Sequence, residues 1–150
     1  MTERQFLVVI ETQRVKGYLF ASRFLRETRG ASMLLDKLNR TETERLLQAT
    51  SCEVVYLGGG SGRVLFASKS EAERCAQQVR ELYQQKTHNA RVSVEVVQRE
   101  EGESFPTWMA RGVRESQRNK LARVEAIRGC QANCVTFFHT GTRLPNRITN

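Results

Sequence analysis

A glycine-rich stretch in the middle of this sequence, Gly58-Gly-Gly-Ser-Gly62, has a spacing that could do chemistry. A P-loop would need a Lys and a Ser or Thr after the last glycine, and a dinucleotide-binding loop would need a glycine at position 63. The sequence has Arg63 and an apolar run instead, which excludes both loops. Two interpretations remain. The stretch is a flexible hairpin turn, or its surplus of glycine over the one or two that a tight hairpin needs lets something approach closely.

A single carboxylate, Glu11, directly follows the first apolar run of the chain, Phe6–Ile10. When a first strand lies beside a hairpin, the end of that strand and the hairpin turn can be neighbours. Enzymes that join nucleotides with two metal ions need carboxylates to hold both ions. Here the turn offers Gly60 and Ser61 in place of acids, so Glu11 alone is too little for two metals.

Near the C-terminus, Cys130, Cys134 and His139 have the spacing of three of the four ligands of a structural zinc site. The alternative is two free thiols and a surface histidine. Cys52 precedes an apolar strand and Cys75 lies on the apolar face of a helix, so both are expected in the core. A disulfide framework is not expected in a chain without a secretory signal.

The net charge of +8 is unevenly distributed. Residues 1–106 carry 16 Lys and Arg against 14 Asp and Glu, whereas residues 107–150 carry 8 against 2. The basic segment suggests contact with nucleic acid or an acidic partner; the alternative is a solvated helix face rich in arginine. The longest apolar run has five residues, far short of the ~20 that a membrane span needs, and the N-terminus lacks the features of a signal peptide. A cytoplasmic location is therefore expected.

The elements that must position these residues follow from periodicity. Phe6–Ile10 is an apolar run rich in β-branched residues and predicts a central strand buried on both faces. Apolar residues at helical spacing over 18–38 predict helices with a break at 29–32, where Ser32 would cap the second helix. Thr41 and Glu44 predict a capping box for a short helix that ends near residue 49.

The middle of the chain predicts a β-hairpin, with strands over 53–57 and 63–67. Ser70 and Glu73 predict a second capping box, before an amphipathic helix that ends near Lys86. Alternation of valine with polar residues over 91–96 predicts a half-exposed strand. The order β-α-β-β-α-β is that of the ferredoxin-like split βαβ fold, an α+β class with helices on one face of an antiparallel sheet.

Beyond a polar linker over 98–104, Pro106 predicts the start of a basic helix that runs to Arg128. The expected organisation is one domain over 1–100 and a basic helical extension over 101–150, which carries the partial zinc motif.

Three blocks of sequence, in order, resemble the first Palm domain of the large, polymerase-like subunit of type III CRISPR effector complexes. They are Glu11-Thr-Gln-Arg-Val-Lys-Gly-Tyr-Leu-Phe-Ala-Ser22, Leu25-Arg-Glu-Thr-Arg-Gly-Ala-Ser-Met-Leu-Leu35 and Val55-Tyr-Leu-Gly-Gly-Gly-Ser61. In that family two Palm domains face each other and make cyclic oligoadenylate from ATP when the complex binds target RNA. One Palm carries Gly-Gly-Asp-Asp, and the other has a glycine-rich turn without acids and helps to hold a nucleotide. This sequence is similar to the second type.

The resemblance implies a nucleotide site formed by Gly58, Gly59, Gly60, Ser61 and Ser32, with Glu11 at the end of the first strand. Arg26 and Arg29 would add positive charge. It implies ATP as the ligand of a composite site, with magnesium and zinc left open as cofactors. It also implies no catalysis by this chain alone, and as partners a second Palm domain, other CRISPR effector subunits or RNA, with a homodimer left open.

Two alternatives belong to other classes. The first is an RNA-binding module of ferredoxin-like topology, which the basic segment favours, although residues 63–68 lack the stacked aromatic residues of an RNA-recognition motif. The second is a standalone minimal CRISPR polymerase or nucleotidyl cyclase, which the missing turn carboxylates oppose.

Overall fold

The computed structural model describes residues 4–87 and 90–119. The chain divides into two units, Met1–Ser116 and Gln117–Asn150. The first unit contains the strands β1 to β4 and the helices α1 to α4 of the described chain. No helix within the described ranges is long and apolar enough to span a membrane.

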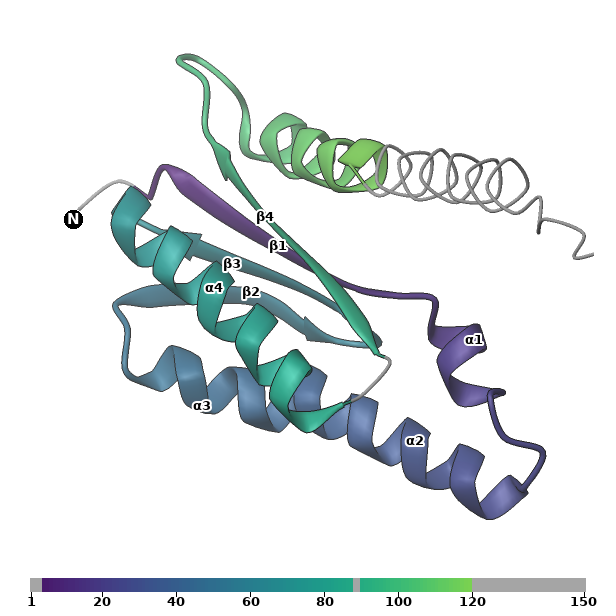
Figure 1. The fold of residues 1–150 in the computed structure, drawn as a ribbon. Coiled ribbons are helices and arrows are strands. Elements are labelled where there is room, and N and C mark those ends of the chain that lie inside the picture. The colour runs from purple at the N-terminus through teal and green to yellow at the C-terminus, as the bar shows by residue number, and fades with distance from the viewer. Residues whose placement is uncertain (1–3, 88–89, 120–150) are drawn as a thin grey trace, which may run out of the picture. The chain divides into compact units, whose positions relative to one another are not determined.

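Four antiparallel strands form one sheet in the order β2-β3-β1-β4 (Figure 1). They are β1 (Phe6–Gln13), β2 (Cys52–Gly58), β3 (Ser61–Phe66) and β4 (Arg91–Gln98). The central strand is β1, and its residues 7–10 are buried, as the apolar run predicts. The strand order and the chain order together are those of a ferredoxin-like fold, which confirms the α+β class.

The helices from α1 to α4 pack in one core against one face of the sheet. They are α1 (Val15–Leu19), α2 (Leu25–Lys37), the π-helical turn η1 (Leu38–Glu42), α3 (Thr43–Gln48) and α4 (Lys69–Lys86). Val8, Ile10 and Val64 of the sheet pack in one core with Leu35 of α2 and Val79 of α4. The helices α2, η1 and α3 follow each other directly and lie beside α4 along the sheet (Figure 1).

Three local sequence predictions about these helices are wrong. The break lies at 20–24, between α1 and α2, because the helix runs on through Gly30 despite the roughly 1 kcal/mol that a mid-helix glycine costs. Thr41 lies inside η1 and caps nothing. Ser70 lies within α4, which begins one residue earlier, with Ser68 at its N-cap position.

Helical residues 105–116 cover the opposite face of the sheet. Trp108 is 1% exposed and packs in a second core cluster with Leu7, Val9, Leu65 and Val97. A Cβ on Gly112 would lie 2.8 Å from Leu7 Cδ2. This second layer buries a face that the alternating valines of β4 predict to be exposed. The domain boundary at about residue 100 stays a prediction.

Candidate functional site

The glycine turn is a two-residue hairpin loop at the end of the central strand. Gly59 and Gly60 form the loop with φ of 59° and 83°, and positive φ at both positions is typical of a type I′ turn. Gly58 has a φ of 150°, and a Cβ on Gly62 would lie 2.8 Å from Leu57 Cδ2. Each glycine thus has a local structural reason, so their surplus alone is no evidence for a ligand.

The turn has two backbone donors that bond to no other described residue. Thr12 N–H donates to Gly60 O at 2.7 Å, which holds the turn against the end of β1. Among the described residues, the N–H groups of Gly59 and Gly60 have no hydrogen-bond acceptor. Gly59 is exposed and Gly60 is half-buried. Phosphate oxygens can accept hydrogen bonds from adjacent backbone N–H groups of this kind.

Glu11 lies beside the turn but is engaged by an arginine. It is opposite Ser61 in the β1–β3 register. Arg63 Nη2 lies 3.2 Å from Glu11 Oε1, and the two side chains are 12% and 17% exposed. The same guanidinium donates to Gly62 O at 2.7 Å. Glu11 is therefore a charge partner of Arg63, and its carboxylate is neutralised within the protein.

A buried polar cluster that sequence reasoning missed lies behind the turn. Thr12 Oγ1 donates to Asn39 Oδ1 at 3.0 Å, and Tyr83 OH donates to the same oxygen. Asn39 comes from η1 and Tyr83 from α4, so β1, η1 and α4 meet here. No local signal marks this cluster, because its members are separated by 27 to 71 positions in the sequence.

The structure brings together five of the six predicted nucleotide-binding residues: Glu11, Gly58, Gly59, Gly60 and Ser61. Ser32 is separate from them. It lies exposed in the middle of α2, seven residues before Asn39, a distance of about 10 Å along a helix axis. Arg26 and Arg29 are likewise exposed on α2.

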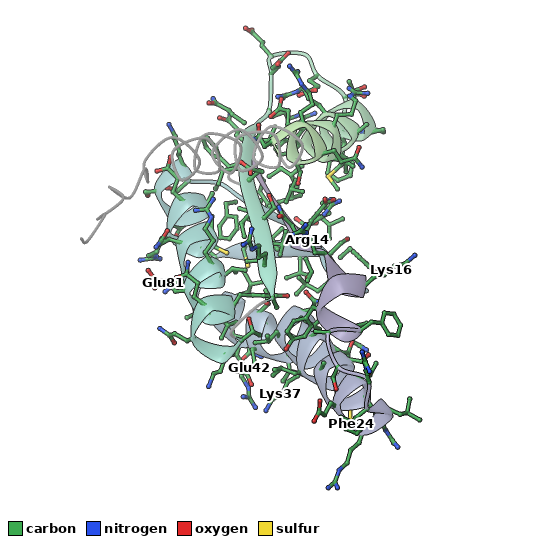
Figure 2. The ribbon with its side chains drawn as sticks, turned by 45° about the vertical axis from the view of Figure 1, so that its right-hand side comes forward. Arg14, Lys16, Phe24, Lys37, Glu42 and Glu81 are labelled. Atoms are coloured by element: carbon green, nitrogen blue, oxygen red, sulfur yellow. The ribbon has the colours of Figure 1, made fainter. Side chains whose placement is uncertain are left out.

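Positive charge lies where β1 ends. Arg14 directly follows the strand with the left-handed φ of 52°, and Lys16 lies in the first turn of α1 two residues later (Figure 2). Both side chains are exposed, and Arg91 lies opposite Gln13 in the neighbouring strand. A left-handed non-glycine residue is uncommon and marks a strained connection at this end of the sheet.

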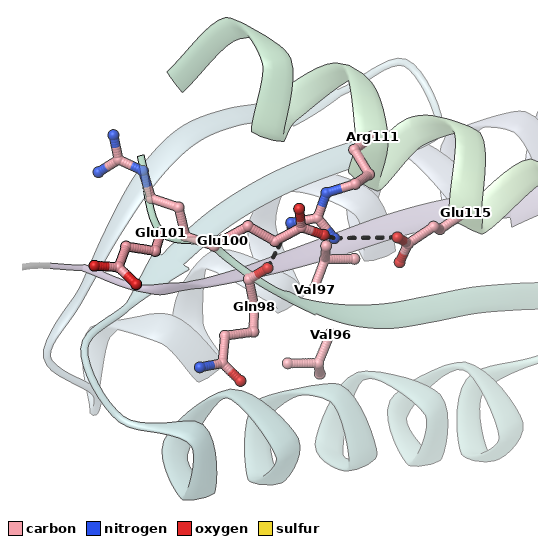
Figure 3. Close-up of a pocket in the computed structure, with 8 residues that line it drawn as sticks. Val96, Val97, Gln98, Glu100, Glu101, Arg111 and Glu115 are labelled. Atoms are coloured by element: carbon pink, nitrogen blue, oxygen red, sulfur yellow. Dashed lines mark hydrogen bonds and ion pairs between the residues drawn. The ribbon is translucent and has the colours of Figure 1, made fainter. Parts of the chain in front are cut away.

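At the opposite end of β4 an open groove of about 490 Å³ is filled with paired charges (Figure 3). Arg111 donates to both oxygens of Glu103, at 3.0 and 2.8 Å, and to Glu115 at 3.1 Å. It also donates to Gln98 O at 2.6 Å. This arginine, which lies in the basic segment expected to contact nucleic acid or an acidic partner, holds the 98–104 connection to the helix.

The same contacts shift the pKa values of Glu103 and Arg111. The hydrogen bond from Arg111 lowers the pKa of Glu103 to about 2, and the pKa of Arg111 is raised in return.

Cys75 is buried as predicted, and burial raises the pKa of its thiol to about 12. Cys52 is half-buried.

The predicted zinc ligands Cys130, Cys134 and His139 lie outside the described residues. Within the described part, no group of three or more His, Cys, Asp or Glu side chains could hold a metal ion. The residues that the structure does describe therefore offer no assembled metal site.

The sheet order, with a hairpin turn at the end of its central strand, defines a Palm-type ferredoxin-like domain. Solved structures share this fold. A Csm1–Csm4 cassette in complex with one ATP matches with a TM-score of 0.64 and 18% identity over 75% of this chain. Csm1 from T. onnurineus matches with a TM-score of 0.59 and 18% identity over 80%.

Csm1 is a type III CRISPR large subunit, so the fold that the sequence resemblance implies is confirmed. The chain spans about a fifth of the length of these proteins, 18% and 20%. No protein-family model matches the chain, and no curated protein matches it in sequence.

Proposed function

We propose that this chain is a catalytically degenerate Palm domain that binds ATP at its glycine turn and supports cyclic oligoadenylate synthesis, and thereby antiviral defence, together with a second Palm. The observation that carries the proposal is the pair of unpaired amides at Gly59 and Gly60, held against the end of β1, which the exposed Arg14 and Lys16 follow in the chain. The similar fold of a Csm1–Csm4 cassette bound to one ATP supports the choice of ligand.

The arrangement fits binding without catalysis. A two-metal nucleotidyl transfer needs several carboxylates around two ions. Here Glu11 is the carboxylate at the turn within the described chain, and Arg63 already neutralises it. The isolated chain is therefore expected to make no oligoadenylate from ATP with Mg²⁺ or Mn²⁺. Product formed by pure protein, and abolished by Glu11→Ala, would contradict this part of the proposal.

A partner surface is expected on the α1–α2 connection and on α2. Four large apolar side chains there are 65–83% exposed: Phe20, Phe24, Leu25 and Met33. Clustered exposure of this kind marks surfaces that another protein covers. A second Palm domain or another CRISPR effector subunit is the proposed occupant, and the partner of the similar Csm1, Csm4, supports the second choice.

The test of nucleotide binding compares two glycines with similar backbones. Gly60 has a φ of 83° and Gly102, in the turn at the other end of the sheet, has a φ of 72° with no atom near its absent Cβ. Replacement of either by alanine imposes similar left-handed strain. Only Gly60→Ala is expected to abolish the ATP-dependent rise in Tm, which should be measurable because saturation at 100 times Kd adds about 2.7 kcal/mol.

The proposal fails if Gly60→Ala retains the full shift of the wild type, since the nucleotide would then bind elsewhere. It also fails if the wild type shows no shift at millimolar ATP, either alone or with its partner Palm. An equal loss of the shift in Gly102→Ala would show that strain, and not the site, causes the effect.

A further inference from the structure

The buried cluster behind the glycine turn has a defined pattern of donors and acceptors. Tyr83 OH and Thr12 Oγ1 both donate to Asn39 Oδ1, and the two hydroxyl oxygens lie 3.2 Å apart. Tyr83 is 1% exposed, Asn39 6% and Thr12 8%. Two hydroxyl protons directed at one oxygen fix which end of the Asn39 carboxamide faces the protein interior.

The other end of that carboxamide faces the turn. A Cβ built on Gly60 would lie 3.8 Å from Asn39 Nδ2 and 3.7 Å from Thr12 Cβ. In the part of the chain that the structure describes, Nδ2 donates to no acceptor. An amide nitrogen has two N–H donors, so this group has hydrogen-bonding capacity beside the two unpaired amides of the turn.

A local distortion brings Asn39 to this place. Leu38 and Asn39 are consecutive and both buried, because η1 widens the helix by a residue. The Thr43 hydroxyl donates to Leu38 O at 2.7 Å, and Thr43 N–H bonds to the same carbonyl. Such π-helical turns frequently occur at functional sites.

We infer that Tyr83 and Thr12 are positioning residues that hold the Asn39 carboxamide in one orientation, with Nδ2 presented at the glycine turn as a donor to an acceptor atom of the bound nucleotide. The ligand in this inference rests on the proposed function, whereas the orientation of Asn39 does not. Burial raises the pKa of Tyr83, so its hydroxyl keeps its proton through the neutral and mildly alkaline range.

The test removes or exchanges one polar atom at a time in the cluster. Tyr83→Phe removes one of the two donors to Oδ1, and Asn39→Asp keeps the shape but replaces the Nδ2 donor by an acceptor. Tyr18→Phe, on α1, is the matched control, because Tyr18 makes no hydrogen bond through its hydroxyl to the described residues. The readouts are the ATP Kd and the NMR signals of the Asn39 side-chain amide in nucleotide-free protein.

Tyr83→Phe is expected to weaken ATP binding roughly tenfold, the factor expected from the loss of about one hydrogen bond, and to shift the Asn39 amide signals without ligand. Asn39→Asp should weaken binding further by placing a negative charge near the phosphates. Tyr18→Phe should change neither readout. Circular dichroism establishes that each variant is folded before binding is compared.

Two results would overturn the inference in distinguishable ways. If the wild type binds ATP and Tyr83→Phe binds it equally well, the positioning role is wrong and the proposed function stands. If the wild type binds no ATP, the proposed function fails, and the NMR readout decides the orientation: unchanged Asn39 signals in Tyr83→Phe refute it. A shift of those signals supports the positioning role even without the nucleotide.

Discussion

The two ends of the sheet differ in whether their polar groups have hydrogen-bond partners. At the end where β4 finishes, Arg111 is shared by Glu103, Glu115 and Gln98 O, and Trp108 Nε1 donates to Val97 O. At the end where β1 finishes, two amides of the glycine turn and Asn39 Nδ2 have no partner among the described residues.

We interpret this difference as one between an architectural end of the sheet and the end that carries the proposed nucleotide site. A cluster whose charged groups pair with one another holds segments together and leaves fewer free groups for a ligand to bind. The glycine-turn end combines spare donors with a left-handed Arg14 and a π-helical turn, and strained conformations of this kind cluster at functional sites. The groove in Figure 3, where Arg111 joins Glu103, Glu115 and Gln98, is thus a structural clamp.

The largest expected effect is in the second core cluster, under the helix that carries the clamp residue Arg111. Trp108→Ala should lower the free energy of unfolding by about 3–5 kcal/mol, because it removes a fully buried ring from the second core cluster. Chemical denaturation measures the loss. The variant should still bind ATP below its unfolding transition. A folded variant that has lost ATP binding would show that the two ends are not independent.

A smaller effect is expected at the turn. Gly59→Ala should cost about 1–2 kcal/mol, because φ is 59° there. Gly59→Asn should cost less, since asparagine tolerates the left-handed region. Denaturation curves of the two variants give the comparison. Equal stability of Gly59→Ala and the wild type would mean that the loop does not have the type I′ geometry.

The charge pair of the clamp predicts a pH dependence. The pKa of Glu103 is about 2 in the folded protein against an ordinary value of 4.5, so the pair stabilises the fold fully above about pH 4.5. This contribution declines as the pH falls toward 2. Tm measured across this range should fall more steeply for the wild type than for Glu103→Gln. Parallel curves would contradict the depressed pKa.

The smallest effect concerns RNA. Arg114 and Arg118 are exposed on the basic helix, whereas Arg111 is engaged in the clamp. If the exposed pair contacts phosphates of a single strand, each substitution by alanine should reduce the salt slope of RNA affinity by about 0.7. Filter binding at several salt concentrations measures the slope. An unchanged slope in both variants would assign RNA contact, if any, to other residues.

Much of the fold follows from short-range pattern. The apolar run of β1, the hairpin and the amphipathic α4 are predicted because each buries a periodic face. The break at 29–32 and the two capping boxes are wrong because tertiary packing outweighs the weak preferences of single glycine, serine and threonine residues. Ser93 is buried because a helix covers a face of the sheet that alternation alone predicts to be exposed.

The sequence predicts the part of the candidate site that one strand and one turn contribute. Glu11 and the glycines are neighbours because the split βαβ order pairs β1 with β3. The pairing of Glu11 with Arg63 and the placement of Asn39 depend on register and on a π-helical turn, neither of which the sequence marks. The resemblance implies a nucleotide contact at Ser32, but the helix start that the apolar pattern predicts there does not exist in the structure.

The central claim is that the nucleotide binds at the glycine turn and not in the groove of the clamp. An NMR titration of the labelled chain with ATP tests it most directly, because both ends of the sheet report in one experiment. The expected result is that the largest shifts occur at the amides of Gly59 and Gly60 and at the side chain of Asn39. Shifts confined to residues 99–103, or none at millimolar ATP, would contradict the claim.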